Sequence, residues 1–587
     1  MELARMVKCN RWLVCSINMG ESDGFDPDII LTIRKYALQN AIEYGGEGKS
    51  GSVLGRALAE RSDLRPHAKS LMNLVDYEVE QANSLAKQQG LEVVRTELEG
   101  IDPDALEREK HQKREGLRDL PGDTSKVVLR FAPNPNGPLS IGHSRGVVIN
   151  SSYAEKYEGK IVLRFDDTDT RVKPPLLEAY RWIEEDFEWI SGRSADIVIK
   201  ASERMPIYLK QAKKMIEGGH GYVCRCEAER FRKFREGGSD CPCREREVAE
   251  SLEDWGAMNS GEIDEGGAVV RVKTSMSLPN PALRDWPALR IQHSPHPIVG
   301  EKYKVWPLLD FQSAVEDHKQ GVTHIIRGKD LMDSTRKQTL LYEHFGWQYP
   351  ETLYWGRVKV HEFGGFSTSG MSSSIAEGEF EGWDDPRLPT LRALRRRGFE
   401  AQSIISLWSE IGLTQKDISI SMQTLEAFNS QIIDGNCERR FFVSDPVSIE
   451  IHGEMSLSEA SISRHPDGLI PGLRQWGVGN SILIQKDDLV QGKLRLKDFA
   501  DIDIDGSNAV IEGGERSDDR PIVHWLPEEI SRKARMFVPE GERGRELVGV
   551  IEDFELIVGE VYQFERVGFA RLEKINEEVA ELVWLHN

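Results

Sequence analysis

Residues 127–146 read VVLRFAPNPNGPLSIGHSRG, and this stretch decides the fold of the chain. It begins with the short β-branched run 127–131, passes through a loop of Pro, Asn and Gly, and from Ile141 has the pattern of a helix. A second apolar run at 161–165 is followed by a helical pattern over 174–190. Strand, loop, helix and strand in this order predict an α/β fold with a doubly wound parallel sheet, in which ligands bind at the carboxyl ends of the strands.

Composition limits the class of protein. The 587 residues include 76 Lys and Arg against 97 Asp and Glu, a formal net charge of −21, so bulk attraction of nucleic acid is excluded and any such partner needs local basic patches. The length predicts several domains, because one domain takes about 100 to 200 residues. With 39% hydrophobic residues the chain is globular, and extended disorder is excluded. We find neither a membrane-spanning run nor a signal peptide, and the cysteines do not form a secreted disulfide framework, so we expect a cytoplasmic protein.

The two ends of the chain have different patterns. Residues 26–45 predict a helix that is capped by Asp26, and a second helix is expected at 70–89. The charged segment 101–126 predicts a linker or a solvated helix. After about residue 440, short alternating runs broken by Gly, Asp and Pro predict an all-β region, either a sandwich or a barrel. The first 25 residues have no clear pattern.

The loop after the first strand can bind a phosphate. Its prolines and glycine make it rigid, and the free N–H groups and the dipole of a helix N-terminus favour an anion. His143, in the first turn of the helix, can donate a hydrogen bond to a phosphate oxygen. A tight strand-to-helix turn capped by this histidine explains the residues equally well, so local chemistry leaves both interpretations open.

Charged residues follow two other predicted strands. Asp166, Asp167 and Asp169 lie after the second strand and can bind a divalent cation or an ammonium group, or form a solvated turn capped by Asp. Arg327 ends an apolar strand, where an arginine is usually part of a surface ion pair. At the ligand-binding edge of the sheet its guanidinium can instead hold a carboxylate in a bidentate manner.

Four of the seven cysteines form two Cys-x-Cys pairs on either side of residues 227–240. Pairs at this separation can supply four thiolates to a tetrahedral Zn²⁺, and a site with four protein ligands is structural because no position is left for a substrate. Four unrelated buried thiols are the alternative. The predicted zinc ligands are Cys224, Cys226, Cys241 and Cys243.

Two segments are rich in one kind of side chain. Residues 364–374, GGFSTSGMSSS, read as a flexible polar linker when taken alone. Residues 387–397, RLPTLRALRRR, contain arginines and no acidic residue, so a helix made of them would repel itself and we expect a polyanion partner. These arginines are Arg387, Arg392, Arg395, Arg396 and Arg397.

Together these motifs resemble those of class I aminoacyl-tRNA synthetases, in the form of the archaeal-type glutamyl-tRNA synthetases of the glutamyl/glutaminyl subgroup. Residues 130–143 resemble the family's RFAPNPxGPLxIGH motif, residues 163–171 its LRxEDTD segment, and residues 381–392 its GWDDPRxPT segment. The resemblance covers most of the chain. It implies a Rossmann-type catalytic domain with a zinc-binding insert, a helical subdomain and a C-terminal β-barrel anticodon-binding region.

The resemblance assigns roles near the first loop. Gly142 and His143 would contact ATP, with His143 stabilising the transition state at the α-phosphate. Ser140 stands where the motif has its first histidine and offers only a hydroxyl. Arg130 would face the amino acid, and Asp166, where the family has Glu, would hold the α-ammonium group.

Arg327 indicates the amino acid by resemblance. Glutamate enzymes have an arginine at this position and glutamine enzymes an uncharged residue, so a side-chain carboxylate held between Arg130 and Arg327 predicts L-glutamate as the substrate. Leu309 stands where bacterial glutamate enzymes and glutamine enzymes have a tyrosine. One expected hydroxyl contact is therefore missing.

The polar loop is identified by its position as the equivalent of the KMSKS loop, which the family usually writes LSTSK. Gly370 stands at the position of the lysine, and the loop has no basic residue, so Lys329 and Lys359 are the candidates to replace that charge on the triphosphate. The ATP-loop residues are Ser367, Thr368, Ser369, Gly370 and Met371.

The patterns and the resemblance together divide the chain into six segments. We expect a helical module with its linker in 1–125, the Rossmann catalytic domain in 126–220 and 301–375, the acceptor-stem insert with zinc in 221–300, a helical stem-contact subdomain in 376–440, and the β-barrel anticodon-binding region in 441–587. The five arginines of 387–397 would meet the tRNA.

The expected function is that of a glutamate–tRNA ligase. ATP with Mg²⁺ would activate L-glutamate to glutamyl-adenylate, and the glutamyl group would pass to the 3′ end of tRNA(Glu). Use of tRNA(Gln), with a tRNA-dependent amidotransferase as partner, stays open. The alternatives are a glutaminyl-tRNA synthetase, against which Arg327 argues, a catalytically weak RNA-binding paralogue, which Gly370 and Ser140 favour, and a zinc-dependent RNA-binding module.

Overall fold

The computed structural model describes residues 25–61, 64, 67–102, 117–363, 366–452 and 458–587. The N-terminal residues without a pattern and most of the predicted linker lie outside these ranges. The chain divides into two units, Met1–Glu115 and Gly116–Asn587, and each is described by itself. Among the described residues, no helix has the length and apolar character that crossing a membrane requires.

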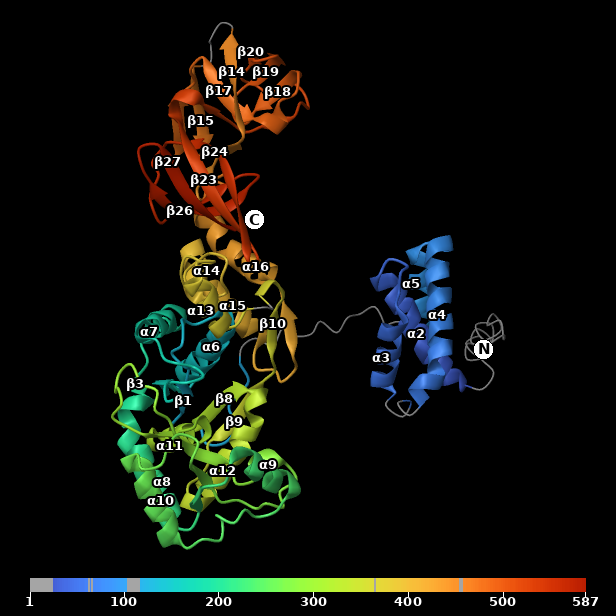
Figure 1. The fold of residues 1–587 in the computed structure, drawn as a ribbon. Helices are drawn as coiled ribbons and strands as arrows, with labels where there is room; N and C mark the ends of the chain where they lie inside the picture. Colours follow the sequence, from blue (N-terminus) through green and yellow to red (C-terminus); the bar gives the residue numbers. More distant parts are fainter. Residues whose placement is uncertain (1–24, 62–63, 65–66, 103–116, 364–365, 453–457) are drawn as a thin grey trace. The chain divides into compact units, whose positions relative to one another are not determined.

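The N-terminal unit is a group of helices (Figure 1). The Asp26 carboxylate accepts the Asp28 N–H at 3.1 Å and Pro27 opens the first helix, because proline has no N–H to leave unpaired there. Both predicted helices are confirmed. The four helices are α2 (Pro27–Glu43), α3 (Ser50–Glu60), α4 (Ala68–Gln89) and α5 (Leu91–Ile101), and their apolar faces share one core.

The second unit contains the predicted Rossmann-type sheet. The parallel strands β1, β2 and β3 pair in that order, and β8 pairs in parallel with β9. Thr323 N–H donates to Val128 O at 2.9 Å, and further along both strands Arg130 Nη1 donates to Ile326 O at 3.4 Å, so β8 runs beside β1 in the same direction. The order is therefore β3-β2-β1-β8-β9. The bounds are β1 (Val128–Phe131), β2 (Lys160–Phe165), β3 (Ile197–Lys200), β8 (His324–Gly328) and β9 (Glu351–Trp355).

Helices cross over between these strands. The run that begins at Ile141 forms α6, as predicted, and its apolar residues enter the same core as β1 and β2. The strand order reverses between β1 and β8, and at such a switch point the two flanking crossovers diverge and leave a crevice for ligands. The helices are α6 (Ile141–Lys156), α7 (Leu177–Ser191), α11 (Leu309–Lys319) and α12 (Met332–Phe345).

An insert lies between β3 and β8 in the sequence. It contains an antiparallel sheet with the order β4-β5-β6-β7, and this sheet and helices α8 and α10 share a core of their own. The bounds are β4 (Gly221–Cys224), β5 (Val269–Val272), β6 (Pro287–Ile291), β7 (Val305–Pro307), α8 (Met205–Glu217), α9 (Ala228–Gly237) and α10 (Val248–Ser260).

A helical region follows the sheet. It contains α13 (Thr368–Ala376), α14 (Leu391–Arg397), α15 (Ala401–Ile411), α16 (Met422–Ile433) and the parallel pair of β10 (Val358–Val360) and β11 (Ile418–Ile420). Helix α15 packs on α6, where the Trp408 Nε1–H donates to Ser144 Oγ at 2.8 Å. Helices α14, α15 and α16 thereby share the hydrophobic core of the parallel sheet, whereas the buried Met371 of α13 belongs to a separate cluster.

The C-terminal region is built of β-strands, as predicted (Figure 1). The strand orders define two seven-stranded sheets that are nearly closed. The first has the order β12-β25-β26-β27-β23-β24-β13, and its two edge strands are joined by Phe441 alone. The second has the order β21-β18-β19-β20-β14-β17-β22, and its edge strands flank His524. Because the two edge strands of each sheet adjoin in the chain, each sheet curves until its edges nearly meet. Of the two predicted architectures, the barrel is therefore the one observed, not the sandwich.

The strands of this region range from two residues in β12 to ten in β23 and β24. The hairpin of β15 and β16 accompanies the two sheets. The bounds are β12 (Arg439–Arg440), β13 (Phe442–Ser444), β14 (Pro446–His452), β15 (Glu459–Ser463), β16 (Leu473–Gly477), β17 (Ser481–Gln485), β18 (Gly492–Leu496), β19 (Asp501–Asp505), β20 (Asn508–Gly513), β21 (Ile522–Val523), β22 (Trp525–Pro527), β23 (Ser531–Glu540), β24 (Arg543–Glu552), β25 (Val561–Phe564), β26 (Gly568–Ile575) and β27 (Val579–His586).

Candidate active site at the switch point of the sheet

Two predicted arginines meet where the strand order reverses. Arg130 lies on β1 and Arg327 on β8, and the side chains of both are nearly buried, with 7% and 6% of their surface exposed. Burial lowers the pKa of Arg130, and the neighbouring charges of Arg327 and Arg164 lower it further, whereas Asp317 opposes the shift. Two guanidinium groups that repel each other in a buried place form a site that an anion stabilises.

A buried ion network fixes the floor of this site. Arg164, on β2, donates from Nη1 to the Asp317 carboxylate at 2.6 Å and from Nε to the Asp166 carboxylate at 2.7 Å. Burial alone would lower the pKa of Arg164, but the two carboxylates outweigh it and raise the pKa well above its usual value. Gln312, on α11, donates to Asp166 at 2.9 Å. The network therefore joins β2 to α11.

Several buried polar atoms of the site have no hydrogen-bond partner among the described residues. A buried polar atom without a partner costs about 1–3 kcal/mol, and native proteins contain few of them. Those at this site include both donors and acceptors, so a polar ligand that carries both kinds of group can pair with them. The atoms are Arg130 Nε, Arg327 Nε, Gln312 Oε1 and Asp317 Oδ2.

The acidic residues after β2 face different partners. Asp166 points into the network just described, whereas Asp167 is buried and accepts from the Tyr180 hydroxyl at 2.6 Å and from Ser202 Oγ at 2.7 Å. Asp169 accepts from Arg290 at 2.9 Å. The three carboxylates do not form a common cation site among the described residues. Asp169 also accepts the Arg171 and Val172 N–H groups at 3.1 and 3.0 Å, so the alternative of a turn capped by Asp holds for this residue.

The start of α6 has the capping geometry that the sequence left open. Ser140 is the N-cap residue, and its N–H donates to His143 Nδ1 at 3.2 Å while its hydroxyl lies 3.1 Å from the same nitrogen. Gly142 and His143 are nevertheless exposed at the first turn of the helix. Capping therefore fixes the orientation of the imidazole and leaves this helix end accessible to an anion.

The polar loop contacts the loop before α6. A Cβ placed on Gly137 would lie 2.9 Å from Thr368 Cγ2 and 3.0 Å from the Trp383 ring, so the two loops touch and only glycine fits between them. Ser367 caps α13 by accepting the Gly370 N–H at 3.1 Å, Ser369 follows in the first turn, and Met371 is buried. The arrangement presents hydroxyl and N–H groups beside the exposed start of α6.

The two lysine candidates are placed differently. Lys329 forms an ion pair with Asp417 at 2.8 Å, so its charge is already used within the protein. Lys359 lies on β10, in the segment that leads to the polar loop, and is exposed.

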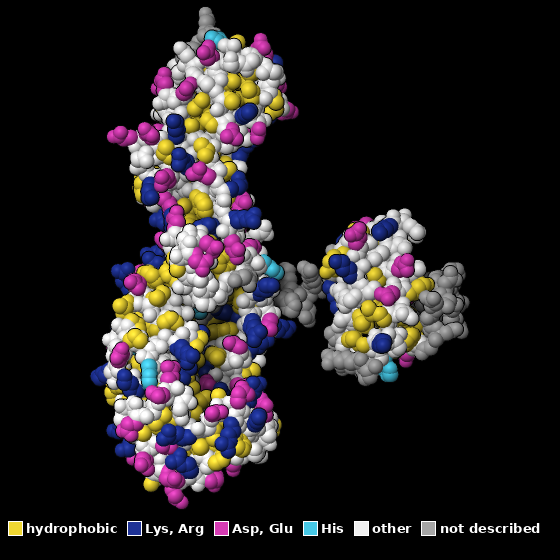
Figure 2. Space-filling model, in the orientation of Figure 1, with side chains coloured by type: hydrophobic (Ala, Val, Ile, Leu, Met, Phe, Trp, Pro, Cys, Tyr) yellow, Lys and Arg dark blue, Asp and Glu magenta, His cyan; other side chains and the backbone are white. Residues whose placement is uncertain are grey.

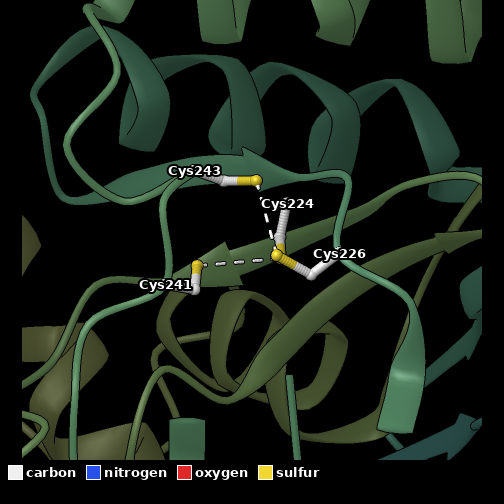
Figure 3. A group of neighbouring side chains, drawn as sticks. All are labelled: Cys224, Cys226, Cys241 and Cys243. Carbon is white, nitrogen blue, oxygen red and sulfur yellow. Dashed lines mark hydrogen bonds between the residues drawn. The ribbon is translucent and has the colours of Figure 1, made fainter. Parts of the chain in front are cut away.

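The four cysteines of the insert come together, as Figure 3 shows. Their sulfur atoms all lie within 4.8 Å of one another, and each residue offers one ligand atom. A tetrahedral Zn²⁺ with Zn–S bonds of about 2.3 Å needs sulfurs about 3.8 Å apart. The Cys224–Cys241 and Cys226–Cys243 sulfur distances of 4.0 and 3.7 Å fit this requirement. The Arg225 N–H also donates to the Cys243 sulfur at 3.4 Å, which favours a thiolate.

The arginines of 387–397 have partners within the protein. Arg387 pairs with Asp385 at 2.6 Å and Arg392 with Glu185 at 3.0 Å. Arg396 pairs with Glu573 on β26 at 2.5 Å, and Arg397 is buried and donates to Leu585 O at 2.5 Å. Arg395 remains exposed and lies 5.8 Å from the Trp189 ring. Figure 2 shows Lys and Arg side chains mixed with Asp and Glu on the visible face.

Sequence reasoning missed part of the site. Gln312 and Asp317 are buried polar residues on α11, and their only signal was their place in an otherwise core-forming helix. Arg164 lies within the segment 163–171, and the resemblance implies no role for it. Gln338 and Tyr349 hydrogen-bond to Arg327, and neither belongs to a recognised motif.

Comparisons with known proteins identify the family of the chain. Residues 126–435 match the family described as tRNA synthetases class I (E and Q), catalytic domain, and residues 437–515 match the anti-codon binding domain of the same synthetases. The chain therefore belongs to the class I tRNA synthetases of the glutamate and glutamine group, and synthetases of this family use ATP.

The similar proteins narrow the group further. A glutamate–tRNA ligase of Archaeoglobus fulgidus is 44% identical over 93% of this chain and 98% of that protein. A glutamate–tRNA ligase of Methanosarcina mazei is 42% identical over 95% of this chain and 99% of that protein. The chain belongs to the family of archaeal glutamate–tRNA ligases.

One prediction concerns Asp186 on α7, whose Oδ2 accepts the Leu139 N–H of the loop before α6 at 3.2 Å. Burial raises its pKa to about 7 although Arg392 and Arg395 oppose the shift. Since the folded pKa lies above the unfolded one, the folded protein binds the extra proton between about pH 4 and 7. Stability is therefore lost as pH rises through this window, by up to about 1.4 kcal/mol per pH unit.

Asp186→Asn keeps an acceptor for Leu139 and does not titrate. We measure the free energy of unfolding with urea and compare the variant with the unaltered protein. The difference, variant minus unaltered protein, should increase steadily from pH 4.5 to 7. Glu178→Gln, at an exposed position on the same helix, is the control and should show no such trend. A difference for Asp186→Asn that stays constant with pH contradicts the prediction.

Proposed function

We propose that this protein activates L-glutamate with ATP and transfers the glutamyl group to the 3′ end of tRNA(Glu). The observation that carries the choice of glutamate is the environment of Arg327. Its Nη2 lies near three neutral oxygens, and it has no carboxylate partner among the described residues. A nearly buried guanidinium without a counter-charge favours a carboxylate over a neutral amide.

The proposed roles of the other pocket residues follow from their contacts. Arg130 would bind the substrate from the strand beside that of Arg327; its Nε makes no hydrogen bond among the described residues and lies 3.5 Å from Asp317. The Asp166 carboxylate accepts from Arg164 and Gln312 and still has lone pairs for the α-ammonium group. Held in this way, the substrate α-carboxylate would attack the α-phosphate of ATP, and pyrophosphate would leave. Positioning and charge stabilisation are the main contributions in such a reaction.

ATP is proposed to lie across the start of α6 and the polar loop. Gly142 would allow the triphosphate to approach, and His143 would donate to the α-phosphate as charge develops there. Ser140 orients the imidazole. Mg²⁺ would arrive with the nucleotide. The N–H groups and hydroxyls of the first turn of α13 would bind the outer phosphates in place of a lysine.

The proposed tRNA contacts include the 387–397 arginines and the insert. Of the five arginines, Arg395 is exposed, whereas Arg397 would act by holding the segment in place. Whether tRNA(Gln) is a second acceptor, with an amidotransferase that converts the product, is part of the same proposal and is tested by charging both tRNAs.

The decisive experiment is pyrophosphate exchange with glutamate or glutamine, with and without tRNA. We expect exchange with glutamate when tRNA is present. Arg327→Gln should lower kcat/KM for glutamate by about 100-fold, because the loss of a buried charge pair costs about 2–5 kcal/mol. Arg336→Gln, an exposed arginine on α12, is the matched control and should change little. Absence of exchange with glutamate would disprove the proposed enzymatic activity. A preference for glutamine would disprove the proposed specificity for glutamate.

Gly370→Lys tests the missing loop charge. Gly370 has a helical backbone, and a Cβ there would meet only the Ser367 hydroxyl, at 3.0 Å, which can rotate. A lysine should raise the rate of pyrophosphate exchange about tenfold or more, since a charge-assisted hydrogen bond contributes about 1.5–3 kcal/mol. Gly370→Met has a long side chain without charge and serves as the control. An unchanged rate for the lysine variant would show that another cation already binds the triphosphate.

The four cysteines are proposed to bind one structural Zn²⁺. The relevant measurement is elemental analysis of freshly purified protein, in which we expect about one zinc per chain. Cys241→Ser should release the metal and lower the thermal stability of the insert, because the binding energy of a structural zinc is folding energy. Cys437→Ser, at a buried cysteine outside the insert, should retain the zinc. Protein without zinc that folds normally contradicts this site.

A further inference from the structure

We propose that Tyr349 and Gln338 are positioning residues that hold Arg327 in place by neutral hydrogen bonds alone and thereby determine selectivity for the substrate's side-chain carboxylate. The inference rests on the proposed function and deepens it. It assigns the discrimination between carboxylate and amide to residues that do not themselves contact the substrate.

The orientation of Gln338 is fixed by its other end. Its Nε2 donates to the Asp310 carbonyl at 3.1 Å and to Ser313 Oγ at 2.6 Å. A carbonyl oxygen can only accept, so the amide group cannot be flipped. The Gln338 Oε1 must therefore face Arg327, and it accepts from Nη2 at 3.0 Å.

The proton order around Tyr349 follows from the same argument. Its hydroxyl donates to Gln338 Oε1 at 2.7 Å and lies 2.8 Å from Arg327 Nη2. A guanidinium has donors only, so the hydroxyl must accept from Arg327 and give its own proton to Gln338. Each hydrogen bond among Arg327, Tyr349 and Gln338 therefore has one possible direction of donation, and together these bonds hold the guanidinium in one orientation.

A second arm supports the same nitrogen. Thr335 Oγ1 accepts from Arg327 Nη2 at 2.6 Å and from the Tyr354 hydroxyl at 2.5 Å. Thr335 and Gln338 both lie on α12, one turn apart, so one helix face carries both acceptors. The two N–H groups of Nη2 therefore face three acceptors and are fully engaged, whereas Nε makes no hydrogen bond among the described residues.

The cradle of Arg327, which consists of Thr335, Gln338 and Tyr349, is neutral and leaves the positive charge of Arg327 uncompensated. Its oxygens belong to an amide and to hydroxyls, whereas the neighbouring Arg164 is paired with two carboxylates. Burial raises the pKa of Tyr349 to about 12, and Asp317 contributes in the same direction, while Arg327 and Arg130 lower it. The phenol consequently stays neutral near pH 7 and does not become a counter-ion for Arg327.

Tyr349 also bears on the absence of a tyrosine at position 309. Leu309 begins α11 and is 49% exposed. The hydroxyl that contacts Arg327 comes instead from the segment between α12 and β9. A tyrosine hydroxyl therefore contacts Arg327 even though position 309 has none.

The test compares Tyr349→Phe with Tyr342→Phe. Tyr342 is a buried tyrosine whose ring centroid lies 4.9 Å from that of Tyr349, and its hydroxyl donates to Ala314 O rather than to Arg327. Both variants lose one hydroxyl in the same core, so a purely structural effect should be alike in both. We expect Tyr349→Phe to raise KM for glutamate about tenfold, to leave kcat within threefold, and to lower the glutamate-to-glutamine ratio of kcat/KM about tenfold, since a hydrogen bond to a charged group is lost. Tyr342→Phe should leave all three within twofold.

Gln338→Glu tests the neutrality of the cradle. A carboxylate at this position would pair with Arg327, so we expect kcat/KM for glutamate to fall about 100-fold, with the loss in KM, and the preference over glutamine to disappear. Gln338→Met, which has neither charge nor acceptor, should resemble Tyr349→Phe.

The outcomes separate the two proposals. If the unaltered protein does not exchange pyrophosphate with glutamate, the proposed function fails. If it does, and Tyr349→Phe keeps its KM and its glutamate preference within twofold or behaves like Tyr342→Phe, the positioning role is overturned. Retention of the glutamate preference by Gln338→Glu, with the thermal transition unchanged, also overturns it.

Discussion

The pocket depends on the buried ion pair of Arg164 and Asp317. Their side chains are each 1% exposed, and the pair spans 2.6 Å between β2 and α11. The same Asp317 oxygen lies 3.5 Å from Arg130 Nε, so three elements meet at one carboxylate. Removing either partner would leave an uncompensated charge in the core, which costs about 3–5 kcal/mol. Because desolvation offsets the attraction of such a pair, its main effect is to fix the positions of β1, β2 and α11.

This arrangement sets the distribution of charge in the pocket. Arg164 is neutralised by two carboxylates, and Arg130 lies at the edge of one of them. Arg327 has neutral partners only among the described residues. The compensation of the arginine charge by carboxylates thus decreases from β2 through β1 to β8. The uncompensated positive charge is therefore greatest at Arg327 on β8. A ligand with two carboxylates and one ammonium group has its charges in the places that this gradient favours.

The sequence predicted the elements that depend on local chemistry. The β-branched run, the glycine loop and the start of α6 are encoded within about twenty residues, and the paired cysteines specify a common site by their spacing. Arg327 could be singled out by its motif. Tyr349 could not, because its contact with Arg327 arises from the crossover through α12, and no pattern in the sequence marks it. The sequence also could not decide between a barrel and a sandwich for the C-terminal region. Closure depends on edge strands that pair with strands far away in the sequence, such as β12 with β25 and β13 with β24.

The five arginines of 387–397 show why composition alone is incomplete. A run of like charges is unfavourable when isolated, but Glu185 and Glu573, each more than 170 residues away, pair with Arg392 and Arg396. Arg397 is buried against the last strand. At the other end of the same helix, the Leu391 N–H donates to Leu139 O at 2.8 Å and the Pro389 carbonyl accepts from Ile141. Helix α14 therefore connects the first barrel to the loop before α6. Arg396 and Arg397 form the barrel side of this connection, and only the exposed part of the arginine charge is left for a polyanion.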